Sequence, residues 1–235
     1  ARLVPVPLEL GGKGANLVFA DADLDNAVRW SIRAIFTNAG QVCLAGSRLY
    51  VQRPIYEEFL ARFVAAAEAM TIGDPKVETT EIGPLASAEH YAKVTGYLDR
   101  VEPEGGKILT GGRGEGWVVR PTVLVDLPPH APHCREEIFG PIVVVAPFDT
   151  EKEAVQAANA TPYGLNAMLF TENLHRAHRV SAKLKAGTVW VNCFFIRDLR
   201  APFGGVEDSG VGREGGNFSR EFFTEPKAVV MQINA

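Results

Sequence analysis

The spacing of hydrophobic residues along the chain alternates between two periods. Apolar residues three and four positions apart predict amphipathic helices over 22–38 and 87–100, whose first turns can be capped by Asp21 or Asp23 and by Ser87. Pro54 stands where a helical first turn tolerates proline and predicts a helix that ends before Gly73. Short apolar runs predict strands over 48–52, 107–110 and 118–125.

The second half of the chain repeats strand and helix. Residues 141–147 are a Val/Ile run typical of a strand buried on both faces of a parallel sheet. Thr150 and Glu153 form a capping box for a helix that extends to Ala160. A strand over 165–171, a helix over 174–184 and a strand over 188–192 follow. This order predicts an α/β fold with a mostly parallel sheet flanked by helices.

The C-terminal part of the chain differs in composition from the rest. Glycines crowd 204–216, which predicts a loop, and the apolar run 228–233 predicts a last strand. The G-x-G-x-x-G match at 210–215 is discounted as a dinucleotide site, because about 20 residues follow it and a βαβ unit needs more.

Composition narrows the class of protein. The 235 residues are 46% hydrophobic and 22% charged, with a net charge of −4, which excludes a disordered or fibrous chain. The mild acidity argues against a nucleic-acid partner, and no apolar stretch reaches the roughly 20 residues that span a bilayer. No secretory leader opens the chain, so we expect a cytoplasmic protein.

Histidines and cysteines do not form a convincing metal site. The run 130–134 offers two histidines and a thiol, and His175 and His178 lie three apart on a predicted helix. Each set is half of a coordination shell, so we predict no metal. The three cysteines, Cys43, Cys134 and Cys193, have no close pairing and are interpreted as free thiols.

Cys43 is the strongest candidate for a nucleophile. It lies among small residues after a predicted helix and before a predicted strand, where a thiol is approachable. A nucleophilic cysteine needs a base to take its proton. Glu9 is a candidate, because it ends a predicted strand among apolar neighbours that would desolvate its carboxylate. A structural cysteine and a surface glutamate remain the alternative reading.

Five motifs in order over nearly the whole chain resemble those of the aldehyde dehydrogenase superfamily. They are LELGGK at 8–13, GQVC at 40–43, EEIFGP at 136–141, PFGG at 202–205 and SGVGRE at 209–214. The resemblance implies the catalytic domain of that family, with a mostly parallel Rossmann-like sheet.

The resemblance also implies roles for individual residues. Cys43 would attack the aldehyde carbon and its backbone N–H would be one donor to the oxyanion, while Glu9 would activate the water that hydrolyses the thioester. Glu137 and Phe139 would hold the nicotinamide ribose and ring of NAD or NADP. Leu10 and Gly11 would lie on the same cofactor side.

Family members are about twice as long, and their N-terminal half carries most of the dinucleotide-binding domain. This chain therefore resembles a catalytic half: 1–13 as the last strand of a missing cofactor domain, 14–216 as the catalytic domain and 217–235 as an oligomerisation tail. We expect a homo-oligomer, most simply a dimer, and expect the lone chain neither to bind NAD(P)+ tightly nor to oxidise aldehydes.

The segment before PFGG suggests the substrate class. In the family it lines the mouth of the aldehyde pocket together with Phe203, and its Ile-Arg-Asp-Leu run resembles the 2-hydroxymuconic and 2-aminomuconic semialdehyde dehydrogenases. Arg197 in this run would bind the distal carboxylate of a semialdehyde, since a guanidinium matches a carboxylate bidentately. The alternative is that Arg197 pairs with Asp198 or another surface acid.

Two further functions stay open at this point. The chain could be a truncated, non-catalytic or assembly-only relative whose motifs are remnants. It could also be a cofactor-free thiol esterase, because Cys43 and Glu9 could hydrolyse an activated ester. A CoA-acylating enzyme is disfavoured, because such relatives usually lack the glutamate that Glu9 retains.

Overall fold

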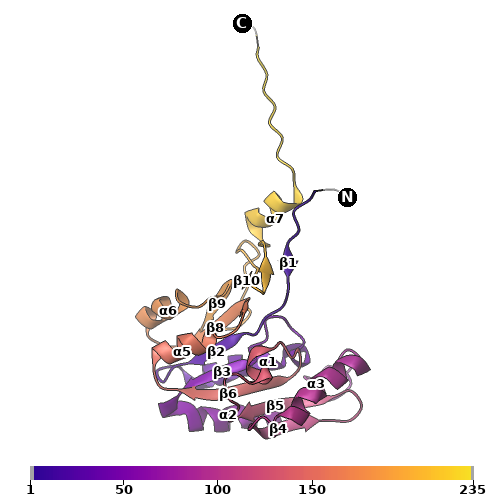
Figure 1. Cartoon of the computed structure of the whole chain (residues 1–235), viewed down its shortest axis with the longest axis vertical. Helices are drawn as coiled ribbons and strands as arrows, with labels where there is room; N and C mark the ends of the chain where they lie inside the picture. Colours follow the sequence, from indigo (N-terminus) through magenta and orange to yellow (C-terminus); the bar gives the residue numbers. More distant parts are fainter. Residues whose placement is uncertain (1–2, 234–235) are drawn as a thin grey trace.

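A seven-stranded sheet forms the centre of the molecule, for which a computed structural model describes residues 3–233. The strand order is β4-β5-β6-β3-β2-β8-β9, and only the edge pair β4–β5 is antiparallel (Figure 1). The strands are β2 (Ala15–Val18), β3 (Arg48–Gln52), β4 (Lys107–Arg113), β5 (Val119–Val125), β6 (Ile142–Phe148), β8 (Asn166–Phe170) and β9 (Thr188–Val191). The predicted α/β class with a mostly parallel sheet is confirmed.

Helices cover both faces of this sheet. The first face packs against α1 (Leu24–Phe36), α2 (Tyr56–Glu68) and α3 (Ala88–Arg100), and the second against α5 (Glu151–Ala158) and α6 (Leu174–Ser181). Successive side chains of β2 enter opposite cores: Leu17 lies in the second core and Val18 in the first. That alternation is what a strand covered on both faces requires.

The helix starts follow the capping residues of the sequence. The side chains of Asp23 and Ser87 accept hydrogen bonds from the backbone N–H groups of Asn26 and His90, and Thr150 with Glu153 forms the predicted capping box. Pro54 differs from expectation: it lies in the 3-10 turn η2 (Arg53–Ile55), and α2 begins at Tyr56. The 3-10 turn η1 (Thr37–Gly40) follows α1 directly.

Small pairings attach the two ends of the chain to the sheet domain. β1 (Leu8–Glu9) pairs antiparallel with β11 (Gly210–Val211), and β7 (Tyr163–Gly164) pairs with β10 (Val206–Glu207). The glycine-rich run is therefore partly strand. At Gly210 the carbonyl oxygen of Leu8 would lie 1.9 Å from a Cβ atom, so close pairing with β1 accounts for that glycine.

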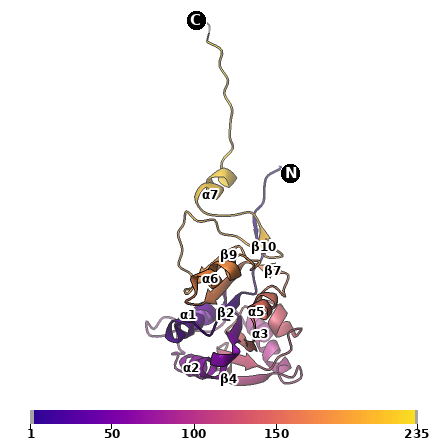
Figure 2. The same ribbon diagram turned by 90° about the vertical axis from the view of Figure 1, so that its left-hand side faces the viewer.

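The predicted C-terminal strand over 228–233 is wrong. These residues adopt no regular structure and extend away from the domain beyond the short helix α7 (Gly216–Phe223), which the hydrophobic pattern did not predict (Figures 1 and 2). A strand needs a neighbour for its backbone groups, and this run has none between residues 3 and 233. No helix in the same range is long and apolar enough to cross a bilayer.

Candidate active site

The segment that carries Glu9 lies directly against the loop that carries Cys43. Leu10 donates its backbone N–H to the Ser209 carbonyl over 2.9 Å, and the chain then turns through Gly11 at a φ of 84°. A Cβ atom on the buried Gly12 would lie 2.9 Å from the carbonyl oxygen of Cys43. Only glycine allows this approach, so the LGG sequence brings the two signature motifs together.

Cys43 occupies a turn between η1 and β3. The Ala45 N–H donates to the Val42 carbonyl over 3.0 Å, which closes the turn around the thiol. The side chain is half-buried, and desolvation, together with the carboxylates of Glu9 and Glu137, raises its pKa to about 11. The backbone amide of Cys43 acts in the opposite direction. In this chain the sulfur is therefore a thiol at neutral pH, and any nucleophilic role needs a base.

Glu9 itself is exposed, which corrects the expectation of an apolar setting. β1 is two residues long and pairs only with β11, so Leu8 and Leu10 remain 45% and 55% exposed and do not cover the carboxylate. The Gly11 N–H donates to Glu9 Oε1 over 3.1 Å. The carboxylate thus lies at the rim of the site, near the thiol whose pKa it raises.

Glu137 contacts the same glycine turn. Its Oε1 accepts the Gly12 N–H over 3.0 Å, and a Cβ atom on Gly11 would lie 2.3 Å from its Oε2. Desolvation raises the pKa of Glu137, while the Gly12 amide and Lys93 oppose the shift. The structure thus brings Glu137 together with Gly11, Gly12 and Cys43, although Glu137 lies 94 positions after the cysteine.

Phe139 and Phe203 are both half-buried. Phe139 follows Glu137 closely and adopts a positive φ of 61°. Phe203 lines a small cavity of about 110 Å³ that Glu9 also lines, between β1 and residues 211–214. Two of the predicted site residues, Glu9 and Phe203, therefore share one hollow.

Arg197 does not form the alternative ion pair with Asp198. Asp198 binds Arg200 instead, with a nitrogen–oxygen distance of 2.6 Å. The Arg197 guanidinium lies over the rings of Phe195 and Phe203, 5.6 and 4.9 Å from their centroids. Contacts with ring faces leave the edge N–H groups of a guanidinium available to an anion.

Sequence reasoning missed Lys13, the last residue of the LELGGK motif. Its side chain is buried, and Nζ has no hydrogen-bond partner within residues 3–233. Desolvation and the charge of Arg48 lower its pKa to about 7. Arg48 is itself buried and donates to the carbonyl groups of Lys13, Ala157 and Ala158. The feature of the sequence that could have indicated this is a single lysine, Lys13, between glycines and apolar residues.

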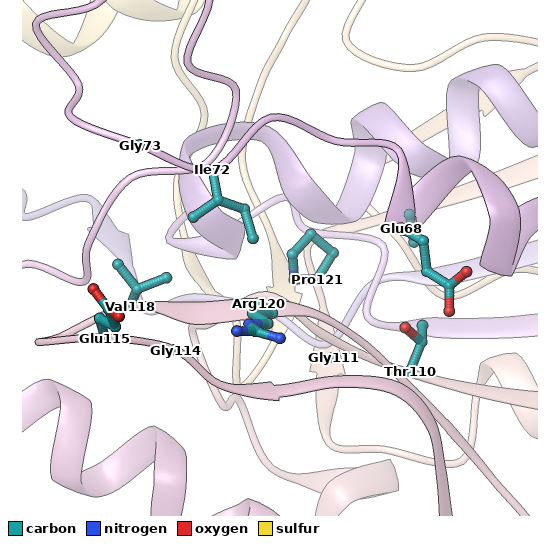
Figure 3. Close-up of a pocket in the computed structure, with 11 residues that line it drawn as sticks. Glu68, Ile72, Gly73, Thr110, Gly111, Gly114, Glu115, Val118, Arg120 and Pro121 are labelled. Carbon is teal, nitrogen blue, oxygen red and sulfur yellow. The ribbon is translucent and has the colours of Figure 1, made fainter.

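A larger hollow lies elsewhere. A groove of about 720 Å³ separates the end of α2 from the β4–β5 pair, with Glu68, Thr110 and Arg120 on its walls (Figure 3). None of the predicted site residues lines it. The candidate catalytic residues Glu9 and Cys43 therefore lie outside this groove.

The histidines do not gather into a metal centre. Within residues 3–233 no three His, Cys, Asp or Glu side chains could hold an ion together. The buried His133 instead contacts the Tyr97 carbonyl through Nε2 at 2.7 Å and Glu104 Oε2 through Nδ1 at 3.1 Å.

Comparison with known proteins agrees with this arrangement. A family model described as "Aldehyde dehydrogenase family" matches residues 1–229. The chain therefore belongs to the aldehyde dehydrogenase family. A 2-hydroxymuconic semialdehyde dehydrogenase of Pseudomonas sp. (strain CF600) is 50% identical over 238 residues, which cover 97% of this chain and 49% of that protein.

Other similar proteins also match nearly the whole of this chain over about half of their own length. A 2-aminomuconic 6-semialdehyde dehydrogenase of Pseudomonas sp. is 45% identical, over 98% of this chain and 48% of that protein. The crystal structure of PnpE in complex with nicotinamide adenine dinucleotide is 45% identical, with a TM-score of 0.91 over 93% of this chain and 46% of that one. The chain spans about half the length of the curated relatives it matches.

Proposed function

We propose that this chain is the catalytic half of an NAD(P)-dependent aldehyde dehydrogenase that oxidises an aldehyde to a carboxylic acid. One observation carries the proposal: the buried Gly12 lies against the Cys43 carbonyl, so that the Glu9 carboxylate and the Cys43 thiol, far apart in sequence, belong to one site. A thiol and a nearby carboxylate are the nucleophile and the base that covalent aldehyde oxidation requires besides a hydride acceptor.

The chain's own residues account for the proton transfers. Glu9 takes the proton of the Cys43 thiol, and the sulfur attacks the aldehyde carbon to form a thiohemiacetal. A bound NAD+ or NADP+ would supply the hydride acceptor that turns this adduct into a thioester. Glu9, which is exposed at the rim, first passes the thiol proton to solvent. It then removes a proton from the water that attacks the thioester and returns a proton to the departing Cys43 sulfur, which releases the acid and restores the thiol. The Cys43 backbone N–H is the proposed oxyanion donor.

The residues of this chain fit one end of a dinucleotide. The Glu137 carboxylate and the turn at Gly11 and Gly12 form a close approach that a Cβ atom would fill, which supports a role at the nicotinamide ribose. We assign Leu10 and Phe139 to the same end of the cofactor from the motifs that contain them. We assign residues 1–13 to the edge of a cofactor domain, 14–216 to the catalytic domain and 217–235 to an oligomerisation tail. In this assignment the phosphates and the adenosine require a segment outside residues 1–235.

For the substrate we propose a semialdehyde with a distal carboxylate, bound by Arg197 at the Phe203 side of the cavity. The stacked guanidinium beside Phe203, free of Asp198, supports this role. The relatives named for muconic semialdehydes support it as well.

The test uses a chimera in which the N-terminal half of the Pseudomonas semialdehyde dehydrogenase precedes this chain. We expect aldehyde-dependent NADH formation, its loss in Cys43→Ser, and a trapped acyl-thioester on Cys43 in Glu9→Gln, detected by mass spectrometry. An active Cys43→Ser chimera would refute the proposal. Ester hydrolysis by the chain without any dinucleotide, abolished by Cys43→Ser, would favour the esterase. A folded but inert chimera would favour an assembly-only relative.

A further inference from the structure

One face of α3 contacts the segment 136–140 at several points. His90 Nε2 lies 2.7 Å from the Phe139 carbonyl oxygen; because a carbonyl only accepts, Nε2 carries the proton and donates. Lys93 Nζ donates to the Glu137 carbonyl over 3.2 Å. The Tyr97 hydroxyl donates to Glu136 Oε2 over 2.6 Å. His90, Lys93 and Tyr97 are three and four positions apart and so lie on one side of the helix, here called the α3 face.

The contacted segment is held in a conformation that it would not keep alone. Phe139 has a φ of 61°, a left-handed value that a bulky residue keeps only where its surroundings fix it. The His90 ring packs edge-on against the Phe139 ring, with centroids 5.9 Å apart and planes at 68°. His90 therefore contacts both the carbonyl and the side chain of the strained residue.

The next residue brings the segment still closer to the helix. A Cβ atom on Gly140 would lie 2.8 Å from Val94 Cγ1, and Val94 is a fully buried residue of α3. On the other side, a Cβ atom on Gly40 would lie 2.2 Å from the Gly140 carbonyl oxygen. The segment is thus enclosed between α3 and the turn that leads to Cys43.

These contacts connect α3 with the candidate active site. The Glu137 carboxylate accepts the Gly12 N–H, and Gly12 lies against the Cys43 carbonyl. A change in the backbone of 137–140 therefore changes the position of Glu137 relative to Gly12 and Cys43.

We propose that His90 is a positioning residue that holds Phe139 in its left-handed conformation and thereby fixes the Glu137 carboxylate and the Phe139 ring at the nicotinamide end of the site. The part that concerns the cofactor rests on the proposed function. The part that concerns the segment 137–140 does not, and the two are tested separately.

The first test uses the chain as it is. His90→Leu removes the donor, His90→Gln keeps an N–H group at similar reach, and Glu89→Gln is a matched change at an exposed neighbouring position of α3. In His90→Leu we expect hydrogen–deuterium exchange of the peptide spanning 136–140 to rise about five-fold, the factor for one lost hydrogen bond. His90→Gln and Glu89→Gln are expected to stay near the wild-type rate.

A second test on the same chain measures how fast the Cys43 thiol is alkylated. The Glu137 carboxylate contributes to the raised pKa of Cys43, so its displacement in His90→Leu lowers that pKa. We expect alkylation of the Cys43 peptide, at a pH below that pKa, to accelerate about two-fold, which a fall of about 0.3 in the pKa produces. His90→Gln is expected to restore the slow rate.

The third test uses the chimera and distinguishes an effect on cofactor binding from an effect on substrate binding. His90→Leu is expected to raise KM for the dinucleotide about five-fold and to leave KM for the aldehyde unchanged, with rescue in His90→Gln. Equal exchange and alkylation in His90→Leu and the wild type would overturn the positioning role, as would the same change in Glu89→Gln. Altered exchange in a chimera with no dehydrogenase activity would keep the role of His90 for the segment and reject the proposed function.

Discussion

The guanidinium of Arg197 stacks on the ring of Phe203, 4.9 Å from its centroid, at the side of a cavity that Glu9 also lines. The neighbouring Asp198 is engaged by Arg200, so Arg197 keeps its charge for another partner. This relationship makes Arg197 the residue through which substrate selectivity can be tested.

Replacement of Arg197 by alanine in the chimera should discriminate between substrates. With a semialdehyde acid we expect KM to rise about 30-fold, which corresponds to about 2 kcal/mol for a lost charged hydrogen bond. With an uncharged aldehyde of equal length we expect little change. Arg220→Ala is the matched control, because Arg220 is an exposed arginine of α7 away from Asp198. An equal loss on both substrates would show that Arg197 is structural.

Alkylation of Cys43 should follow its raised pKa. In the wild-type chain we expect the rate to increase with pH up to a midpoint near the pKa of about 11, because only the thiolate reacts. Glu9→Gln removes one of the carboxylates that raise this pKa, so its midpoint should move to lower pH. Mass spectrometry of the Cys43 peptide distinguishes it from the peptides of Cys134 and Cys193. An unchanged midpoint in Glu9→Gln would show that Glu9 does not contribute to the raised pKa of Cys43.

Lys13 should make stability depend on pH. Its pKa falls from 10.5 when unfolded to about 7 in the folded chain, so the unfolded chain binds more protons between these values. The contribution of Lys13 to the free energy of unfolding is therefore greatest above pH 10.5, decreases as the pH falls to about 7, and is constant below.

Replacement by methionine should remove this dependence. We expect Lys13→Met to be more stable than the wild type below pH 7 by up to about 5 kcal/mol, from 1.36 kcal/mol per unit of pKa shift. Urea unfolding at several pH values measures the difference, and Lys152→Met, at an exposed lysine, is the control. A difference that does not vary with pH would mean that Lys13 finds a partner in solution.

The extended tail predicts self-association. Val229, Val230, Met231 and Ile233 are 66–94% exposed, a run of apolar side chains that proteins normally cover. We expect light scattering at tens of micromolar to give the mass of a dimer and not the 25.5 kDa of one chain. Val230→Asp with Met231→Asp should shift the equilibrium towards monomer, whereas Lys227→Asp should not. A monodisperse wild-type monomer would contradict the prediction.

The chain by itself should bind dinucleotides weakly. Micromolar affinity requires about 8 kcal/mol, and in the proposed assignment Glu137, Phe139 and the Gly11 turn contact only the nicotinamide end. Calorimetric titration with NAD+ and with NADP+ is expected to detect no micromolar site. NADH production from an aldehyde by the purified chain would overturn this expectation.

Some features of the fold could be read from the sequence because they depend on neighbouring residues. Asp23, Ser87 and Thr150 cap helices through hydrogen bonds that reach three residues along the chain. The Val/Ile run of β6 is a buried central strand, as its unbroken apolar character predicts. The motifs named Glu9, Cys43, Glu137 and Phe139 as candidates, since the residue types were visible in the letters themselves.

Other features were decided only by the tertiary structure. The four residues of β2 carry no periodic signal, yet they lie in the middle of the sheet because β3 and β8 pair with them on both sides. The apolar run 228–233 shows the opposite case. Its residues are typical of a strand, but they form none because no neighbouring strand within residues 3–233 pairs with them. Local pattern predicts what a segment can form, but strand pairing requires a partner from a distant part of the chain.

The candidate site also combines residues that the sequence identifies with contacts that only the tertiary structure creates. Sequence named Cys43 and Glu137, whereas the contacts of Gly12 with both motifs, the buried Nζ of Lys13 and the bond from His90 to Phe139 exist only once α3, the glycine turn and the Cys43 loop are packed together. Hydrogen bonds and desolvation across these distances depend on the folded positions of atoms and not on spacing along the chain. The sequence by itself determined which chemical groups are present, and the fold decided which of them meet.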